Sequence, residues 1–277
     1  MSSREPPAMM GVSHAVSGAA AGLLITTVAA PSVGVASPRD AFVFAAVAAG
    51  YALLPDLDHP SSTATRRFSW ASVLACYLIR PLSAVVFRMT ATSRDSGRGT
   101  HRGLTHTAVF AAGLGVGANA AVARWGTPAL WLLLFIGVAL AIKGLDALVP
   151  GPPSLVIAAG ATWAITGTVP WHQTAPGADL HTPWLGTAIA VGMLVHSCGD
   201  ALTSSGAPLL APVPIRRRTW YPVRLPRPLR FRTGGPVEGF ILVSLTVAVV
   251  GLALHTVPEL WALTVRASAR VVELAAR

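Results

Sequence analysis

The chain has 277 residues, of which 53% are hydrophobic and only 12% are charged. A soluble domain has about a quarter of its residues charged, so this composition excludes an ordinary soluble fold and indicates an integral membrane protein. The net charge of +10 comes almost entirely from arginine, because Lys143 is the only lysine. We attribute these arginines to membrane topology and anionic lipid head groups, and we do not expect a nucleic-acid partner.

Apolar stretches in chain order predict an all-α fold, a polytopic transmembrane helical bundle in the lipid bilayer. About seven spanning helices are expected, at 12–30, 41–55, 107–124, 127–149, 153–170, 183–200 and 237–257. The stretch 69–89 is also apolar, but Arg80-Pro81 lies at its middle, which predicts a re-entrant or interfacial segment. Residues 1–257 then form a single membrane domain, and residues 258–277 form an amphipathic tail on the membrane surface.

Histidines and aspartates cluster at the edges of these apolar segments. Such groups are costly beside hydrocarbon unless a cation or a polar network compensates them, so they predict a metal site. His196 and Asp200 are four residues apart on a predicted helix, and both can reach one ion from the same face. The alternative for this pair is a structural hydrogen bond between helices.

The other clusters precede or follow apolar segments. In Asp56-Leu57-Asp58-His59, a helix-capping role explains one aspartate but not all three polar residues. His101 and His106 are five residues apart, so they can share an ion only if a helix begins between them, which Gly103 permits. His14 alone is weaker, because a single histidine near a helix start is more often a capping or packing residue.

Arginines accompany the same segment ends and the proline-rich stretch 212–236, which predicts an irregular loop over one face. Cytoplasmic loops are enriched in positive charge. If the segment 69–89 does not cross the membrane, the four polar clusters should all lie on the cytoplasmic side. These clusters contain His14, Asp56 to His59, His101 with His106, and His196 with Asp200. Guanidinium groups suit phosphate, and we expect substrate-binding residues at Arg102, Arg216, Arg217 and Arg218.

The motifs SH near the start, LPDLDHP, HRGLTHT and HSCGDALTSSG, followed by the arginine-rich loop, resemble the YdjM-type family of membrane-bound metal-dependent hydrolases over about residues 11–240. The resemblance implies metal ligands at His14, Asp56, Asp58, His59, His101, His106, His196 and Asp200. One departure is Cys198-Gly199, which stands where leucines are usual between the histidine and the aspartate.

These observations favour a metal-dependent hydrolase of the cell (inner) membrane that acts on a phosphoester or lipid-linked substrate at the cytoplasmic face. Zinc is favoured by the imidazole content, with manganese or magnesium as alternatives. The number of ligands suggests a two-metal site in which Asp56 or Asp58 bridges the ions, with Asp58 and Arg102 as catalytic candidates. The alternative is a non-enzymatic protein that binds or transports the metal. A membrane anchor that binds DNA through 212–236 rests on charge alone.

Overall fold

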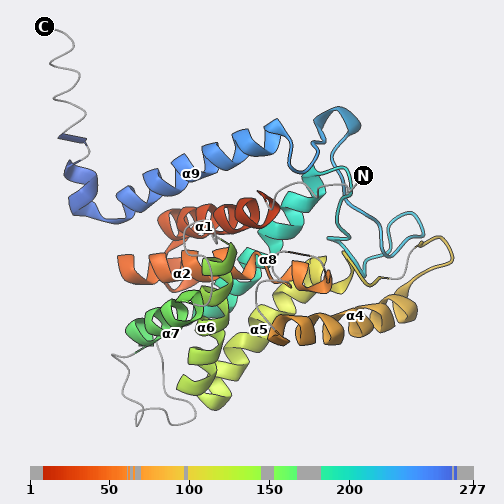
Figure 1. The fold of residues 1–277 in the computed structure, drawn as a ribbon, viewed down its shortest axis with the longest axis horizontal. Helices are drawn as coiled ribbons and strands as arrows, with labels where there is room; N and C mark the ends of the chain where they lie inside the picture. The colour runs from red at the N-terminus through yellow and green to blue at the C-terminus, as the bar shows by residue number, and fades with distance from the viewer. Residues whose placement is uncertain are drawn as a thin grey trace, which may run out of the picture.

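The computed structural model describes residues 9–60, 62, 65, 70–96, 99–144, 153–166, 182–263 and 265–266. Within these ranges the regular structure is helical, which confirms the predicted all-α bundle (Figure 1). The α-helices are α1 (Met9–Ala29), α2 (Pro38–Tyr51), α4 (Trp70–Thr90), α5 (Ala108–Trp125), α6 (Thr127–Gly144), α7 (Pro153–Thr166), α8 (Leu185–Leu202) and α9 (Pro236–Thr256). Short 3-10 turns are η1 (Pro31–Val33), η2 (Pro55–Asp58), η3 (Leu104–His106) and η5 (Arg227–Leu229).

Helix α2 lies at the centre of the bundle. It contacts α1, α6 and α8, and its side chains Phe44, Val47 and Tyr51 are buried in the main core. The Tyr51 hydroxyl donates a hydrogen bond to the Leu133 carbonyl of α6 at 3.1 Å. At Gly50 the backbone of α2 meets that of Gly137 so closely that a Cβ has no room. Small residues therefore allow the close helix packing expected of a membrane bundle.

Seven helices among the described residues are long and apolar enough to cross a membrane, and the chain is a multi-pass membrane protein. The candidate spans are Gly11–Ala29, Pro38–Asp58, Ser72–Thr90, Ala108–Trp125, Thr127–Gly144, Leu185–Leu202 and Pro236–Thr256. The expected span at 153–170 is not among them. Helix α7 has 14 residues, whereas a helix perpendicular to the membrane needs about 20. Residues 167–170 lie outside the described ranges.

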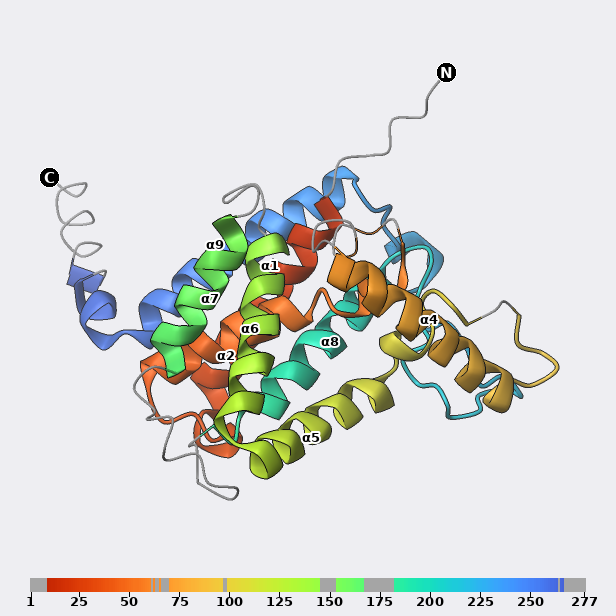
Figure 2. The same cartoon turned by 60° about the horizontal axis from the view of Figure 1, so that its bottom comes forward.

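Helix α4 differs from the expectation for 69–89, because it continues through Pro81 without a break. A proline removes one helical hydrogen bond, and this alone does not end the helix. Its contacts are mainly with η2 and η3 rather than with the long helices. In Figure 2, α4 projects from the end of the bundle that carries these turns. Length and composition make α4 a candidate span, and an interfacial position for it stays a prediction.

The segments that carry the polar clusters gather at this same end of the bundle. Turn η2 contacts η3, α4 and α8. The loop 203–235 between α8 and α9 is irregular, as predicted, with the turn η5 and isolated bridges such as Ala207–Val223. It is joined to the segment after α4, where the Thr92 hydroxyl donates to the Arg217 carbonyl at 2.8 Å. Beyond α9 the chain is described only to residue 266, so the surface tail at 258–277 stays a prediction.

Candidate metal centre

The tightest group of candidate ligands joins η3 to α8. Nε2 of His106 lies 3.2 Å from Nε2 of His196 and 3.4 Å from Oδ2 of Asp200. Nε2 of His196 lies 3.7 Å from the same carboxylate oxygen. All three side chains are almost completely buried. Residues 196 and 200 share one face of α8, as their spacing predicts.

The second nitrogen of each imidazole is directed at an acceptor. Nδ1 of His196 lies 2.7 Å from the Ala52 carbonyl, which can only accept, so Nδ1 carries the proton and Nε2 has a free lone pair in the neutral ring. Nδ1 of His106 lies 3.5 Å from the Asp58 carboxylate and 3.1 Å from the Thr105 hydroxyl. Metal-binding histidines are oriented in this way by acceptors behind the ring.

The three inward atoms fit a divalent cation. Among the described residues, Oδ2 of Asp200 is buried and has no hydrogen-bond donor. Two imidazole lone pairs and a carboxylate oxygen that face one another repel unless a positive charge lies between them. Tetrahedral zinc with bonds near 2.1 Å places its ligands roughly 3.4 Å apart. The observed separations of 3.2, 3.4 and 3.7 Å are close to that value.

A second group overlaps the first. Ligand atoms of His14, Asp56 and His196 lie within 4.8 Å of one another. The His14 ring stacks on His196 at 3.9 Å between centroids, and its Nε2 lies 3.8 Å from Oδ1 of Asp200. Both groups use the one free nitrogen of His196, so they cannot each hold an ion through it. This geometry favours one ion over the two expected from the number of ligands.

Gly199 explains how His14 approaches α8. A Cβ on Gly199 would lie 3.2 Å from Cε1 and 3.4 Å from Nδ1 of the His14 ring. Contacts at the shorter distance are tighter than side chains normally make, so any larger residue would press on the imidazole. Glycine at position 199 therefore leaves the space that the His14 ring occupies.

Asp58 lies outside both groups and is hydrogen-bonded on both oxygens. Its Oδ1 lies 2.8 Å from Nδ1 of His101, while Oδ2 accepts from the Arg102 backbone N–H at 3.0 Å and from the Thr105 hydroxyl at 3.1 Å. The carboxylate is completely buried. Asp58 therefore holds the loop before η3 and the back of His106, a positioning role that sequence reasoning did not distinguish from direct ligation.

His59 and His101 stand at the edge of the site. Their ring centroids are 4.4 Å apart, and the His101 side chain is 39% exposed. Burial and the neighbouring His101 hold the pKa of His59 below its ordinary value. Neither residue belongs to a group of three converging ligand atoms among the described residues. The structure thus brings together five of the eight expected ligands: His14, Asp56, His106, His196 and Asp200.

Arg102 connects this centre to the loop 203–235. Its backbone is left-handed, with φ of 50°, and its side chain donates to Oδ1 of Asp200 at 2.9 Å and to the Gly206 carbonyl at 3.4 Å. Helix α4 supports the same segment, because the Ser83 hydroxyl accepts from the Leu104 N–H at 2.8 Å and donates to the Gly99 carbonyl.

The three loop arginines that were expected to bind substrate differ in their positions. Arg218 lines a cleft beside Arg102, whereas Arg216 and Arg217 are exposed and do not line it. Arg224 lines the same cleft and was missed, since in the sequence it resembles the other loop arginines.

Glu238 holds the start of α9 close to α1 through two hydrogen bonds. It accepts from the Ser13 hydroxyl at 2.7 Å and from the Gly234 N–H at 2.6 Å. The carboxylate therefore joins α1, α9 and the end of the loop 203–235, which gives Glu238 a structural role.

The profile of a family described as YdjM inner membrane protein matches residues 9–152 and 154–261. No curated protein and no solved structure matches the chain. The matched residues include every segment that carries a candidate ligand.

Proposed function

The chain belongs to the YdjM inner membrane protein family, and from this premise we propose that it is a membrane-embedded metal-dependent hydrolase whose substrate is a phosphoester. The proposal rests on the triangle of His106, His196 and Asp200, whose donor atoms are separated by distances that suit a divalent ion. Three protein ligands are typical of catalytic zinc, because the fourth position stays open. Zinc is the preferred ion, with manganese and magnesium as alternatives.

Each residue around the triangle has a defined task in this proposal. When bound, the ion supplies Lewis acidity that polarises a phosphoryl oxygen. Asp58 and the Ala52 carbonyl fix the two imidazoles so that both Nε2 atoms point inward. Asp56, whose side chain is 20% exposed and lies 3.8 Å from His196, is the group placed to accept a proton from water. Arg102 places a positive charge beside Asp200, where charge develops on a phosphoryl group.

An apolar groove supports a lipid-linked substrate. A cavity of about 780 Å³ between α1, α8 and α9 is lined by Ala21, Leu24, Val195 and Leu252 among others. It shares Ser17 with a smaller cavity that reaches His14 and Glu238. A hydrocarbon chain in this groove would have its polar end near the metal centre. The site would lie on the cytoplasmic side if the arginine-rich loops follow the usual charge bias.

A metal carrier is the other candidate. Transporters hold their ions near the middle of the bilayer, with access from both sides. The ligands here come from η2, η3 and the adjoining ends of α1 and α8, which meet at one end of the bundle. A position at one end suits an enzyme that meets its substrate at a membrane face.

The test is metal analysis of the purified full-length protein together with hydrolysis of p-nitrophenyl phosphate, its diester and phosphatidic acid. We expect about one bound ion and metal-dependent turnover, which His196→Ala reduces at least a thousandfold. Arg124→Ala, at the exposed last turn of α5, is the control and should leave turnover unchanged. Bound metal without turnover on any of these esters would overturn the enzyme in favour of the carrier.

A further inference from the structure

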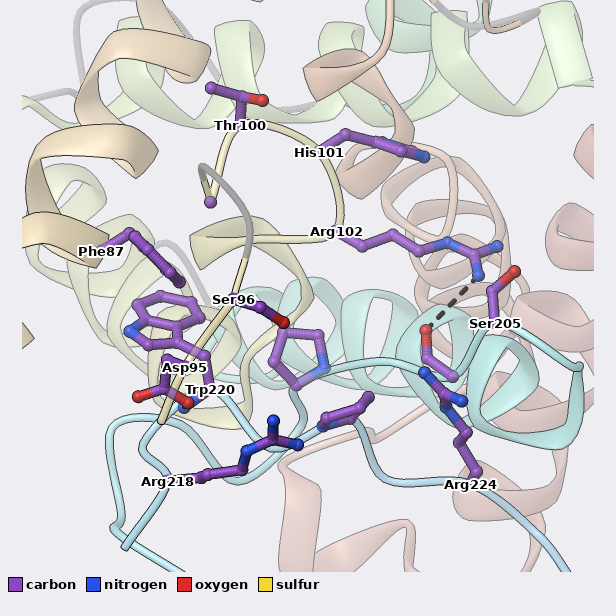
Figure 3. Close-up of a pocket in the computed structure, with 14 residues that line it drawn as sticks. Phe87, Asp95, Ser96, Thr100, His101, Arg102, Ser205, Arg218, Trp220 and Arg224 are labelled. Carbon is purple, nitrogen blue, oxygen red and sulfur yellow. Dashed lines mark hydrogen bonds between the residues drawn. The ribbon is translucent and has the colours of Figure 1, made fainter. Parts of the chain in front are cut away.

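We infer that the cleft between the end of α4 and the loop 203–235 binds the phosphate group of the substrate. This inference rests on the proposed function and gives that site an anion subsite. The cleft is defined by three arginines, Arg102, Arg218 and Arg224, and we call it the arginine cleft. Figure 3 shows these side chains on its walls, with Arg102 on one side and the two loop arginines on the other.

Arg102 pairs with Asp200, but the positive charge of the two loop arginines is not neutralised by a carboxylate. Within the part of the chain that the structure describes, neither Arg218 nor Arg224 has an acidic side chain within ion-pair distance. Asp95, the acidic residue of the lining, is occupied by other donors. Its carboxylate accepts from the backbone N–H groups of Thr92, Thr219 and Trp220 at 2.8 to 3.1 Å. It therefore fixes the loop. Nε of Arg218 donates to the Arg94 carbonyl at 2.8 Å, which leaves the terminal nitrogens of this guanidinium available to an anion.

Arg102 directs the cleft towards the metal centre. Its Nε is buried and has no hydrogen-bond partner among the described residues, although one terminal nitrogen binds Asp200. A buried donor without an acceptor is costly, and an anionic oxygen would satisfy it. Because Arg102 contacts both the carboxylate of the triangle and the cleft, a phosphate held there would lie next to the candidate ion.

Gly206 brings two of the three arginines together. Its carbonyl accepts from Arg102, and the Arg224 side chain packs directly over its Cα, where a Cβ would clash. Its backbone φ of 75° also lies in the left-handed region that favours glycine. The loop is thus shaped so that Arg224 reaches the same space as Arg102.

The cleft has room for more than a phosphate. Its volume is about 370 Å³, and one wall is formed by the rings of Phe87 and Trp220, whose centroids are 5.4 Å apart. The Trp220 indole N–H donates to the Thr90 hydroxyl at 3.0 Å, which fixes the ring. Guanidinium groups on one side and a fixed aromatic wall on the other suit a phosphate attached to a larger head group.

The inference is tested by calorimetric titration of the metal-loaded full-length protein with inorganic phosphate and with dioctanoyl phosphatidic acid. We expect Arg218→Gln and Arg224→Gln each to weaken binding about tenfold, as for loss of a charge-assisted contact. Arg224→Lys keeps the charge but loses the fork, so it should give an intermediate loss. Arg227→Gln, an exposed arginine of the same loop, is the matched control and should bind like wild type.

The two probes separate the sources of the phosphate. Arginine-dependent binding of the lipid alone identifies a lipid head group, and binding of both probes identifies the phosphate itself as the recognised group. Unchanged affinity in Arg218→Gln and Arg224→Gln, or an equal loss in Arg227→Gln, overturns the subsite. Because titration needs no turnover, arginine-dependent binding without hydrolysis would reject only the proposed enzyme. Hydrolysis without arginine-dependent binding would reject only the cleft.

Discussion

Nε2 of His106 and Nε2 of His196 face each other at 3.2 Å, while the opposite nitrogen of each ring is directed at an oxygen acceptor. Two neutral imidazoles in these orientations direct lone pairs at each other. A cation between them, with Asp200 as the third ligand, would turn this repulsion into attraction.

Removal of one triangle ligand should therefore weaken metal binding strongly. We expect His106→Ala and His196→Ala each to raise the Kd for zinc at least a hundredfold, because two ligands and a buried uncompensated charge remain. Competition with a chromophoric chelator measures the Kd. His255→Ala supplies the control, and an unchanged Kd in His196→Ala would remove α8 from the metal centre.

Chelation should destabilise the wild-type protein. A ligand that binds only the folded state at about one hundred times its Kd adds roughly 2.7 kcal/mol to the free energy of unfolding. We therefore expect EDTA to lower the thermal unfolding temperature of the wild type in detergent and to leave that of His196→Ala unchanged. An equal effect of EDTA on both proteins would contradict the proposed site.

Asp58→Asn tests the positioning role of this carboxylate. The substitution keeps the shape but removes the charge that orients His101 and the back of His106. We expect a 10- to 100-fold weaker zinc affinity, as for loss of an acceptor behind a ligand. If Asp58 bound the ion directly, the loss would match that of His196→Ala. Asp40→Asn, at the start of α2, is the matched control.

Gly199→Ala should separate helix stability from site geometry. Alanine favours a helix over glycine by up to about 1 kcal/mol, but the new Cβ would press on the His14 ring. We predict an unfolding temperature that is no lower than that of the wild type, together with weaker zinc binding. Gly117→Ala in α5, where no atom lies within 4 Å, should give the first effect without the second. Equal zinc affinities in the two variants would show that His14 makes no contribution.

Asp95 should make the attachment of the arginine loop depend on pH. Burial raises the pKa of Asp95, but hydrogen bonds from Thr92, Thr219 and Trp220 outweigh it and hold the pKa below its ordinary value. A depressed pKa in the folded protein stabilises the attachment above the unfolded pKa of about 4, and this stabilisation disappears as the pH falls through the folded pKa. Asp95→Asn should remove it at neutral pH.

The measurement is limited tryptic cleavage at Arg216 to Arg218 at pH 8. Cleavage should be several-fold faster in Asp95→Asn than in wild type and unchanged in Asp40→Asn. Equal rates in all three proteins would show that Asp95 does not hold the loop.

The clustering of histidines and aspartates near the ends of apolar segments could be recognised in the sequence. Such polar side chains beside hydrocarbon need a cation or a polar partner to compensate them. The four-residue spacing of His196 and Asp200 also determines a shared helix face. The sequence does not determine which aspartate of Asp56 and Asp58 joins a group of converging ligand atoms. That depends on the loop bearing His101 and Thr105, which packs against Asp58.

The arginines show the same limit. The sequence offers no way to distinguish Arg216, Arg217, Arg218 and Arg224, because all four are arginines of the same loop. The path of the loop decides which of them line the cleft. Gly206 and Asp95 determine that path through a close backbone contact and two hydrogen bonds from the loop to Asp95. Such contacts leave no periodic pattern in the sequence. Helix α7 has an apolar composition typical of a span, and its described part, Pro153–Thr166, has 14 residues.

The origin of the triangle also has a consequence for biogenesis. His196 and Asp200 both come from α8, far along the chain from His14 and Asp56. A ribosome must therefore release most of the protein into the bilayer before any complete set of donors exists. If the site holds an ion, as proposed, its loading is a late event in assembly, and a chain truncated before α8 would be inserted without the complete set of ligands.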